Sequence, residues 1–205
     1  MSGWPQTSNG IGLADVIGRI NATILIGLST VQSAFSEPVV REMARKVERP
    51  ITFPLSNPNS RSEANAEDLI RWTDGRALVA SGSPFAPVSF GGRKIPMAQC
   101  NNIYIFPAMG LGVVASNARR GTESMMLAAA RTLAANSPAL KDPSASLLPP
   151  LTELRRVAAE IAFAVGMEAQ KNGVAPELTE DELRRRVLET QWTPADPNLS
   201  NGELR

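Results

Sequence analysis

The sequence contains no histidine, and this absence excludes more chemistry than any other feature of its composition. A protein without histidine cannot use a Ser-His-Asp or Cys-His nucleophile, His-ligated zinc or iron, or a histidine proton shuttle. The only cysteine is Cys100, so an internal disulfide framework and a cysteine-rich zinc site are excluded as well. Proton transfer by this chain would depend on lysine, carboxylates or Tyr104, its single tyrosine.

An excess of charge of one sign is also missing. The chain has 21 Lys and Arg residues against 20 Asp and Glu residues, a formal net charge of +1, so neither nucleic acid nor an anionic membrane is expected as a partner. The apolar runs stop well short of a membrane span, and the N-terminus lacks the basic start and apolar stretch of a signal peptide. We expect a cytoplasmic protein, and its 205 residues favour one domain with a sizeable core.

Short apolar segments alternate with amphipathic ones in the first half of the chain. The patterns predict strands over residues 22–27, 50–55 and 76–80, and helices over residues 13–20, 36–46 and 66–73. The first strand is continuously apolar, which is typical of a strand covered on both faces. Right-handed crossovers between successive strands of this kind give a parallel sheet.

The second half of the chain has mainly helical patterns. The Pro- and Gly-rich stretch 81–97 predicts a loop or a small hairpin, and helices are predicted over residues 103–117, 123–135, 151–172 and 180–190. Residues 1–12 are expected to be a flexible lead-in and residues 193–205 a disordered tail. The predicted fold of residues 13–192 is therefore α/β: a partial Rossmann-like parallel sheet of three βαβ-linked strands, a possible hairpin, and C-terminal helices.

Four motifs are better explained by structure than by chemistry. Gly110-Leu-Gly-Val-Val-Ala115 matches the dinucleotide pattern G-x-G-x-x-A, but it lies inside a predicted helix instead of between a strand and a helix, so its glycines are attributed to helix packing. Cys100 is interpreted as a packing residue, and the Glu67-Asp68 pair as acids of a first helical turn. The arginines at positions 184–186 are interpreted as a solvated helix face.

Ser and Asn residues follow three of the apolar segments, in Leu55-Ser-Asn-Pro58, Ala80-Ser-Gly-Ser-Pro-Phe85 and Cys100-Asn-Asn-Ile-Tyr104. An asparagine offers donors and an acceptor without net charge, which suits a carboxylate or a nicotinamide carboxamide. Asn57 follows a parallel strand, where open α/β sheets bind ligands, and the helix start expected behind Asn101 would add backbone donors. From local sequence alone, a turn at Asn57 and a helix cap at Asn101 are equally good explanations.

The order and spacing of these three segments closely resemble the malic enzymes, the metal-dependent decarboxylating malate dehydrogenases, and within them the bacterial NAD-dependent branch. The resemblance covers nearly the whole chain, but only the C-terminal part of such an enzyme. The stretch 30–35 departs from it, because the family more often has a Gly-rich sequence there. The cofactor-binding residues that the resemblance implies are Asn57, Ser56, Gly27, Leu28 and Ser29, and the substrate-binding residues are Asn101, Asn102 and Asn57.

The resemblance also implies what this chain does not carry. In the family, the acid–base Tyr and Lys, the metal-binding carboxylates, the malate-binding Arg and the Gly-rich pyrophosphate loop all lie N-terminal to the matched region. No catalytic or metal-binding residue is therefore expected here, and the isolated chain is expected to be inactive. The resemblance implies a homo-oligomer, with Mg or Mn in the full-length enzyme. NAD and NADP are not distinguished, because the ribose-reading residue lies upstream.

The hypothesis from sequence is an NAD- and substrate-positioning segment of an enzyme that oxidatively decarboxylates malate to pyruvate and reduces NAD or NADP. Two alternatives stay open. A related dehydrogenase built on the same half-fold would give a product other than pyruvate. A truncated non-catalytic fragment or pseudoenzyme would act as a partner-binding subunit and form a stable complex with a separate N-terminal polypeptide.

Overall fold

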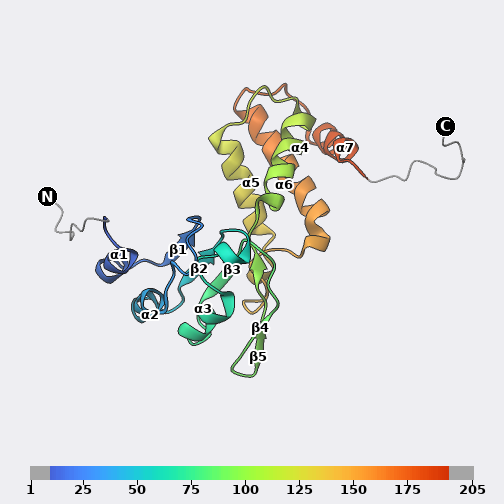
Figure 1. The fold of residues 1–205 in the computed structure, drawn as a ribbon. Coiled ribbons are helices and arrows are strands. Elements are labelled where there is room, and N and C mark those ends of the chain that lie inside the picture. Colours follow the sequence, from blue (N-terminus) through green and yellow to red (C-terminus); the bar gives the residue numbers. More distant parts are fainter. Residues whose placement is uncertain (1–9, 194–205) are drawn as a thin grey trace, which may run out of the picture. The chain divides into compact units, whose positions relative to one another are not determined.

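A computed structural model describes residues 10–193 of the chain (Figure 1). The chain divides into two compact units: a sheet unit formed by Met1–Asn102 and Ala135–Pro150, and a helical unit formed by Ile103–Ala134 and Leu151–Arg205. The composition favours one domain, but the buried apolar side chains form separate cores in the two units. The expected flexible lead-in and disordered tail lie mostly outside the described residues.

The sheet unit contains a parallel sheet of four strands, in the order β1-β2-β3-β6. The strands are β1 (Ile24–Gly27), β2 (Ile51–Pro54), β3 (Leu78–Ser81) and β6 (Ala98–Gln99). The three predicted parallel strands are confirmed. The fourth was not predicted, because two residues are too few to carry a strand pattern. An antiparallel hairpin of β4 (Val88–Phe90) and β5 (Arg93–Ile95) confirms the expected hairpin, and Gly91 and Gly92 form its turn at positive φ.

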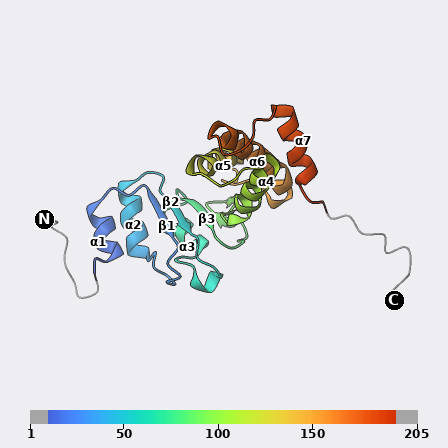
Figure 2. The same ribbon diagram turned by 90° about the horizontal axis from the view of Figure 1, so that it is seen from above.

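Three helices cover one face of this sheet: α1 (Leu13–Arg19), α2 (Glu37–Lys46) and α3 (Ala66–Trp72). Figures 1 and 2 show α2 and α3 alongside the strands that they connect. Right-handed crossovers that proceed in one direction along a sheet place their helices on the same face. The core between them includes fully or almost fully buried Leu25, Val40, Met43, Leu69, Ile70 and Val79.

Long cationic side chains and one asparagine satisfy the helix ends of the sheet unit. Lys46 Nζ donates to the carbonyl oxygens of Ile17 at 2.8 Å and Gly18 at 2.7 Å, at the end of α1. Arg76 donates to three carbonyl oxygens at the end of α2, including that of Ala44 at 3.1 Å. Asn65 Oδ1 accepts from the backbone N–H of Glu67 and caps α3. Such contacts satisfy backbone groups that a helix leaves unpaired at its ends.

The prediction that β1 is covered on both faces is wrong for this structure. Leu25 and Gly27 face the helices, but Ile24 and Ile26 are 52% and 55% exposed. Because α2 and α3 lie on one face only, no described layer covers the other face at β1. In addition, among residues 10–193 the only strand that pairs with β1 is β2, so β1 is an edge strand of the described sheet.

The helical unit is built from α4 (Phe106–Ser116), α5 (Glu123–Ala135), α6 (Leu154–Lys171) and α7 (Glu180–Thr190). The glycines of α4 have different roles. A Cβ on Gly112 would lie 2.7 Å from the Ala162 carbonyl oxygen of α6, so Gly112 permits close packing, as predicted. A Cβ on Gly110 would meet nothing within 4 Å, so the packing explanation is wrong there.

Four short 3-10 turns are found in the described part of the two units: η1 (Asn59–Arg61), η2 (Asn102–Tyr104), η3 (Pro138–Leu140) and η4 (Leu151–Glu153).

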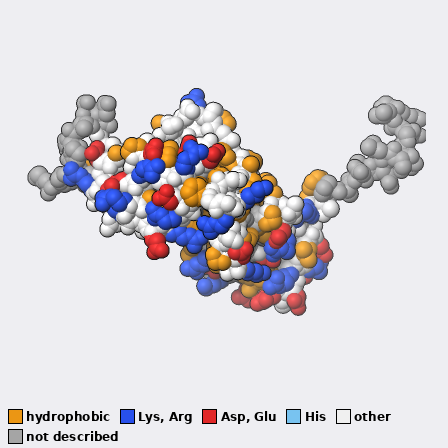
Figure 3. All heavy atoms as spheres, turned by 90° about the horizontal axis from the view of Figure 1, so that it is seen from below, with side chains coloured by type: hydrophobic (Ala, Val, Ile, Leu, Met, Phe, Trp, Pro, Cys, Tyr) orange, Lys and Arg blue, Asp and Glu red, His pale blue; other side chains and the backbone are white. Residues whose placement is uncertain are grey.

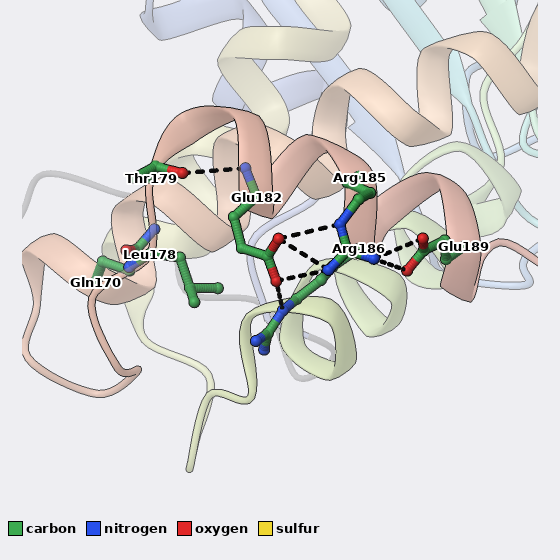
Figure 4. A network of polar contacts seen from close by, with 7 residues as sticks. All are labelled: Gln170, Leu178, Thr179, Glu182, Arg185, Arg186 and Glu189. Carbon is green, nitrogen blue, oxygen red and sulfur yellow. Dashed lines mark hydrogen bonds and ion pairs between the residues drawn. The ribbon is translucent and has the colours of Figure 1, made fainter.

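The helix α7 confirms the helix predicted over residues 180–190, and its start is capped by Thr179, whose Oγ1 accepts from the backbone N–H of Glu182 at 3.2 Å. Figure 4 shows that the Glu182 carboxylate pairs with the arginines one turn later, Arg185 and Arg186, at 2.8 Å each. Arg184 is exposed, and its guanidinium lies 3.7 Å from the centre of the Phe163 ring. The arginines thus form a largely solvated face with local partners.

The surface carries both signs of charge. On the face shown in Figure 3, Lys and Arg side chains are interspersed with Asp and Glu, and hydrophobic side chains lie between them. No helix within residues 10–193 is long and apolar enough to cross a membrane.

Candidate functional site

Ser and Asn residues gather at the carboxyl ends of the four parallel strands, because all these ends lie at the same edge of the sheet. Each strand is followed, two or three residues after its end, by one of these side chains: Ser29 after β1, Asn57 after β2, Ser83 after β3 and Asn101 after β6. The ladder continues past the strands: the backbone N–H of Leu55 donates to the Gly27 carbonyl at 2.9 Å, and that of Gly82 to the Pro54 carbonyl at 3.3 Å. These loops are therefore held in a fixed order beside one another.

Asn57 is exposed, and its side chain reaches the loop after β3. Its Oδ1 accepts a hydrogen bond from Ser83 Oγ, which fixes the orientation of the amide. A Cβ on Gly82 would lie 3.0 Å from Asn57 Nδ2 and 2.2 Å from the Leu55 carbonyl oxygen. Only glycine fits at position 82, a residue whose importance the sequence did not reveal. The peptide bond between Asn57 and Pro58 is cis.

Asn101 is half-buried, and its Nδ2 donates to the Gly82 carbonyl oxygen at 3.3 Å. Asn102 is exposed and opens the turn η2. The expected helix start directly behind these residues is wrong, because α4 begins at Phe106 with Ile105 as its N-cap. Pro107 sits in the first helical turn, where proline is favoured, and so fixes the later start. Asn101 is therefore not the cap of this helix.

Ser29 and Ser56 both donate to the carboxylate of Glu63, a residue that the sequence did not single out. Glu63 Oε1 accepts from the Ser29 N–H at 2.7 Å, from Ser29 Oγ at 2.9 Å and from Ser56 Oγ at 2.6 Å. Its Oε2 accepts from the Ser56 N–H at 3.3 Å. Glu63 is 0% exposed. In sequence it lies in a polar loop before a helix, where nothing distinguishes it from a solvated acid.

The hydrogen bonds keep Glu63 ionised despite its burial. Burial raises the pKa of Glu63, but the hydrogen bonds from Ser56 and Ser29 outweigh burial and lower its pKa to about 2. A carboxylate that accepts several hydrogen bonds from backbone and hydroxyl groups behaves in this way. The site therefore contains a buried negative charge at any pH near neutrality.

Gly27 has a structural reason to be glycine. A Cβ there would lie 2.5 Å from Glu63 Cδ, a separation that no packed structure tolerates. Leu28 is 75% exposed and follows directly. The structure thus places Gly27, Leu28 and Ser29 at the carboxyl end of β1, and the Glu63 carboxylate beneath Gly27.

A cavity of about 440 Å³ lies elsewhere, at the amino-terminal ends of β2 and β3, and Arg49, Arg76, Arg93 and Lys94 are among its lining residues. Arg76 is already engaged by three carbonyl oxygens. We assign the candidate site to the carboxyl edge instead, because open parallel sheets bind ligands there.

Burial raises the pKa of Cys100, which favours the neutral thiol and a packing role. Within residues 10–193, no group of three His, Cys, Asp or Glu residues is arranged to hold a metal ion.

Comparison with known proteins identifies the family. Residues 1–170 match the family model described as malic enzyme, NAD binding domain. The chain belongs to the malic enzyme family. It is 50% identical over 194 residues to the NAD-dependent malic enzyme of Edwardsiella ictaluri, and 50% identical over 191 residues to that of Vibrio campbellii. These matches cover 95% and 93% of this chain.

The chain spans about a third of the length of these curated relatives, 34% in both cases. Solved malic enzymes share the fold. The structure from Pyrococcus horikoshii Ot3 matches 87% of this chain with a TM-score of 0.63 and 24% identity, and that from Entamoeba histolytica matches 91% with a TM-score of 0.64 and 23% identity. Each match covers 36% of the solved chain. The predicted partial Rossmann-like fold and the predicted family are both confirmed.

Proposed function

We propose that this chain forms the nicotinamide- and malate-positioning edge of an enzyme that oxidatively decarboxylates malate to pyruvate with reduction of NAD. The observation that carries the proposal is the convergence of Ser29, Asn57, Ser83 and Asn101 at one edge of a parallel sheet. Neutral amides orient a carboxamide or a carboxylate without being titrated themselves. The family and the NAD-dependent relatives support the choice of NAD as the cofactor.

The residues present fit the nicotinamide end of NAD. Asn57 Oδ1 is held by Ser83 Oγ, and this orientation leaves the Asn57 amide nitrogen as an exposed donor for a carboxamide oxygen. Gly82 permits the close approach of this loop to Asn57, since a Cβ there would lie 3.0 Å from that nitrogen and would collide with the Leu55 carbonyl. NAD, when bound, supplies the acceptor for the hydride that leaves C2 of malate. Asn57, Asn101 and Asn102 then contribute binding and orientation.

Proton transfer and metal binding are assigned to other parts of the enzyme. The resemblance locates the acid–base Tyr and Lys and the Mg or Mn ligands N-terminal to the matched region. We therefore expect the 205-residue chain alone to form no NADH from malate. We also propose a cytoplasmic homo-oligomer, as the resemblance implies.

An exchange enzyme tests the proposal. In it, this chain replaces the matching segment of the Edwardsiella ictaluri relative, to which it is 50% identical. We expect metal-dependent formation of NADH and pyruvate from malate, and none from the 205-residue chain alone. An exchange enzyme that is folded and binds metal, yet forms no pyruvate, would contradict the proposal. A different product would favour a related dehydrogenase.

One observation favours the second candidate, a non-catalytic partner-binding subunit. The edge strand β1 exposes Ile24 and Ile26, and Leu28 follows at 75% exposure. An apolar edge strand is a template for pairing with another chain. Mixing the 205-residue chain with the separate N-terminal portion of the relative decides between the two: a stable complex without malate oxidation supports the subunit.

A further inference from the structure

The hydrogen bonds around Glu63 extend into the loop that follows β1. Ser56 Oγ donates to Glu63 and also accepts from the backbone N–H of Thr30 at 2.9 Å. Thr30 has a φ of 57°, a left-handed conformation that β-branched residues rarely adopt. Its Oγ1 donates to the Ser29 carbonyl oxygen at 2.6 Å. The unusual conformation of this loop is thus held by contacts that lead back to one carboxylate.

Within the described residues, Glu63 takes part in no ion pair. The hydrogen bonds that its carboxylate accepts from Ser29 and Ser56 come from neutral groups. A buried charge is costly unless every acceptor site is hydrogen-bonded, and a fully bonded network makes its surroundings rigid. The side chain also fills the space left by Gly27. All these contacts join the end of β1 to the end of β2.

We propose that Glu63 is a positioning residue for the cofactor site. It holds the loops of Ser29 and Ser56 in the geometry that binds the nicotinamide end of NAD, with Asn57 as the next residue in the second loop. This inference rests on the function proposed above. Ordering these loops before binding lowers the cost of binding, so their loosening weakens NAD binding more than it slows the chemical step.

Glu63→Gln tests the local part of the proposal in the 205-residue chain. Donors face both carboxylate oxygens, so the amide NH₂ of glutamine meets a donor in either orientation. We expect hydrogen exchange of the Ser29 and Thr30 amides to accelerate at least about tenfold. The Phe35 amide, which donates to the Glu63 main-chain carbonyl at 2.9 Å, should change little. Equal acceleration of all three amides would indicate general unfolding and overturn the local role.

The exchange enzyme tests the functional part. We expect Glu63→Gln to raise KM for NAD about tenfold or more, with a smaller change in kcat. Glu67→Gln is the matched control, because it makes the same chemical change on an exposed residue whose carboxylate pairs, in the described part of the chain, with Arg71 alone. The control should keep the original kinetics. A folded Glu63→Gln enzyme with an unchanged KM for NAD would overturn the proposal.

A second variant covers the case in which Glu63→Gln does not fold. Ser56→Ala keeps the charge but removes one donor to Glu63 and the acceptor of the Thr30 amide. We expect a raised KM for NAD in the folded enzyme, and an unchanged KM would overturn the inference. An exchange enzyme without any substitution that forms no NADH would instead contradict the proposed function. The hydrogen-exchange rates of the Ser29 and Thr30 amides in the 205-residue chain would still test the local role of Glu63.

Discussion

Gly82→Ala should destabilise the sheet unit by forcing apart the ends of β2 and β3. An added Cβ would lie 2.2 Å from the Leu55 carbonyl oxygen, whereas real Cβ atoms essentially never come closer than 3.0 Å, so one of the two backbones must move by about 0.8 Å. The Gly82 N–H also donates to the Pro54 carbonyl, and the Gly82 carbonyl accepts from Asn101. Overpacking of this kind costs about 1–3 kcal/mol.

Calorimetry of the 205-residue chain measures this effect. For a chain of this size, Tm should fall by about 2–4 °C for each kcal/mol. Gly18→Ala is the matched control within the same unit: a Cβ there meets nothing within 4 Å in helix α1, so it should stabilise by up to about 1 kcal/mol. A Gly82→Ala chain that melts like the unsubstituted chain would refute the close approach of the two strand ends.

Three further predictions concern stability, pH and association. Thr52 Oγ1 is buried and has no hydrogen-bond partner among the described residues, so Thr52→Val should stabilise the chain by about 1 kcal/mol, and a lowered melting temperature would contradict this. The pKa of Glu63 is lowered from 4.5 to about 2, so its stabilisation is complete above pH 4.5 and is lost as pH falls towards 2. The difference in unfolding free energy between the original chain and Glu63→Gln should therefore shrink over that range, and a constant difference would be evidence against the assignment. Ile26 is 55% exposed on an edge strand, so Ile26→Lys should reduce self-association in sedimentation experiments, and an unaltered distribution would exclude this edge as the contact.

The parallel sheet was predictable because its strands and helices carry strong local signals. The apolar run at β1 ends in Gly27, and Asn65 caps α3 through its own side chain. The strand β6 was not predictable, because it exists only through pairing with β3, and its two residues have no pattern of their own. The exposure of Ile24 and Ile26 was missed for a related reason: which face of a strand is covered depends on where the helices pack.

The candidate site was predictable only in part. Asn57 and Asn101 stand out in sequence because polar residues follow apolar strands, and the structure brings them to one edge through Ser83 and Gly82. Glu63 gave no signal, since its burial depends on donors from residues 29 and 56, which only the folded chain brings to it. Gly82 was hidden for the same reason, because its constraint comes from the neighbouring strand.

The most direct test of the positioning role is Asn57→Asp in the exchange enzyme. Aspartate keeps an oxygen that can accept from Ser83 Oγ, so the structural hydrogen bond survives, but the donor to the ligand is lost and a negative charge is added. We expect kcat/KM to fall about ten- to a hundredfold, because this is the effect of losing one hydrogen bond to a charged or strongly polar group. Tm should change little. Unchanged kcat/KM for malate and unchanged NAD affinity, together with a lowered Tm, would contradict the account and leave Asn57 as a turn residue.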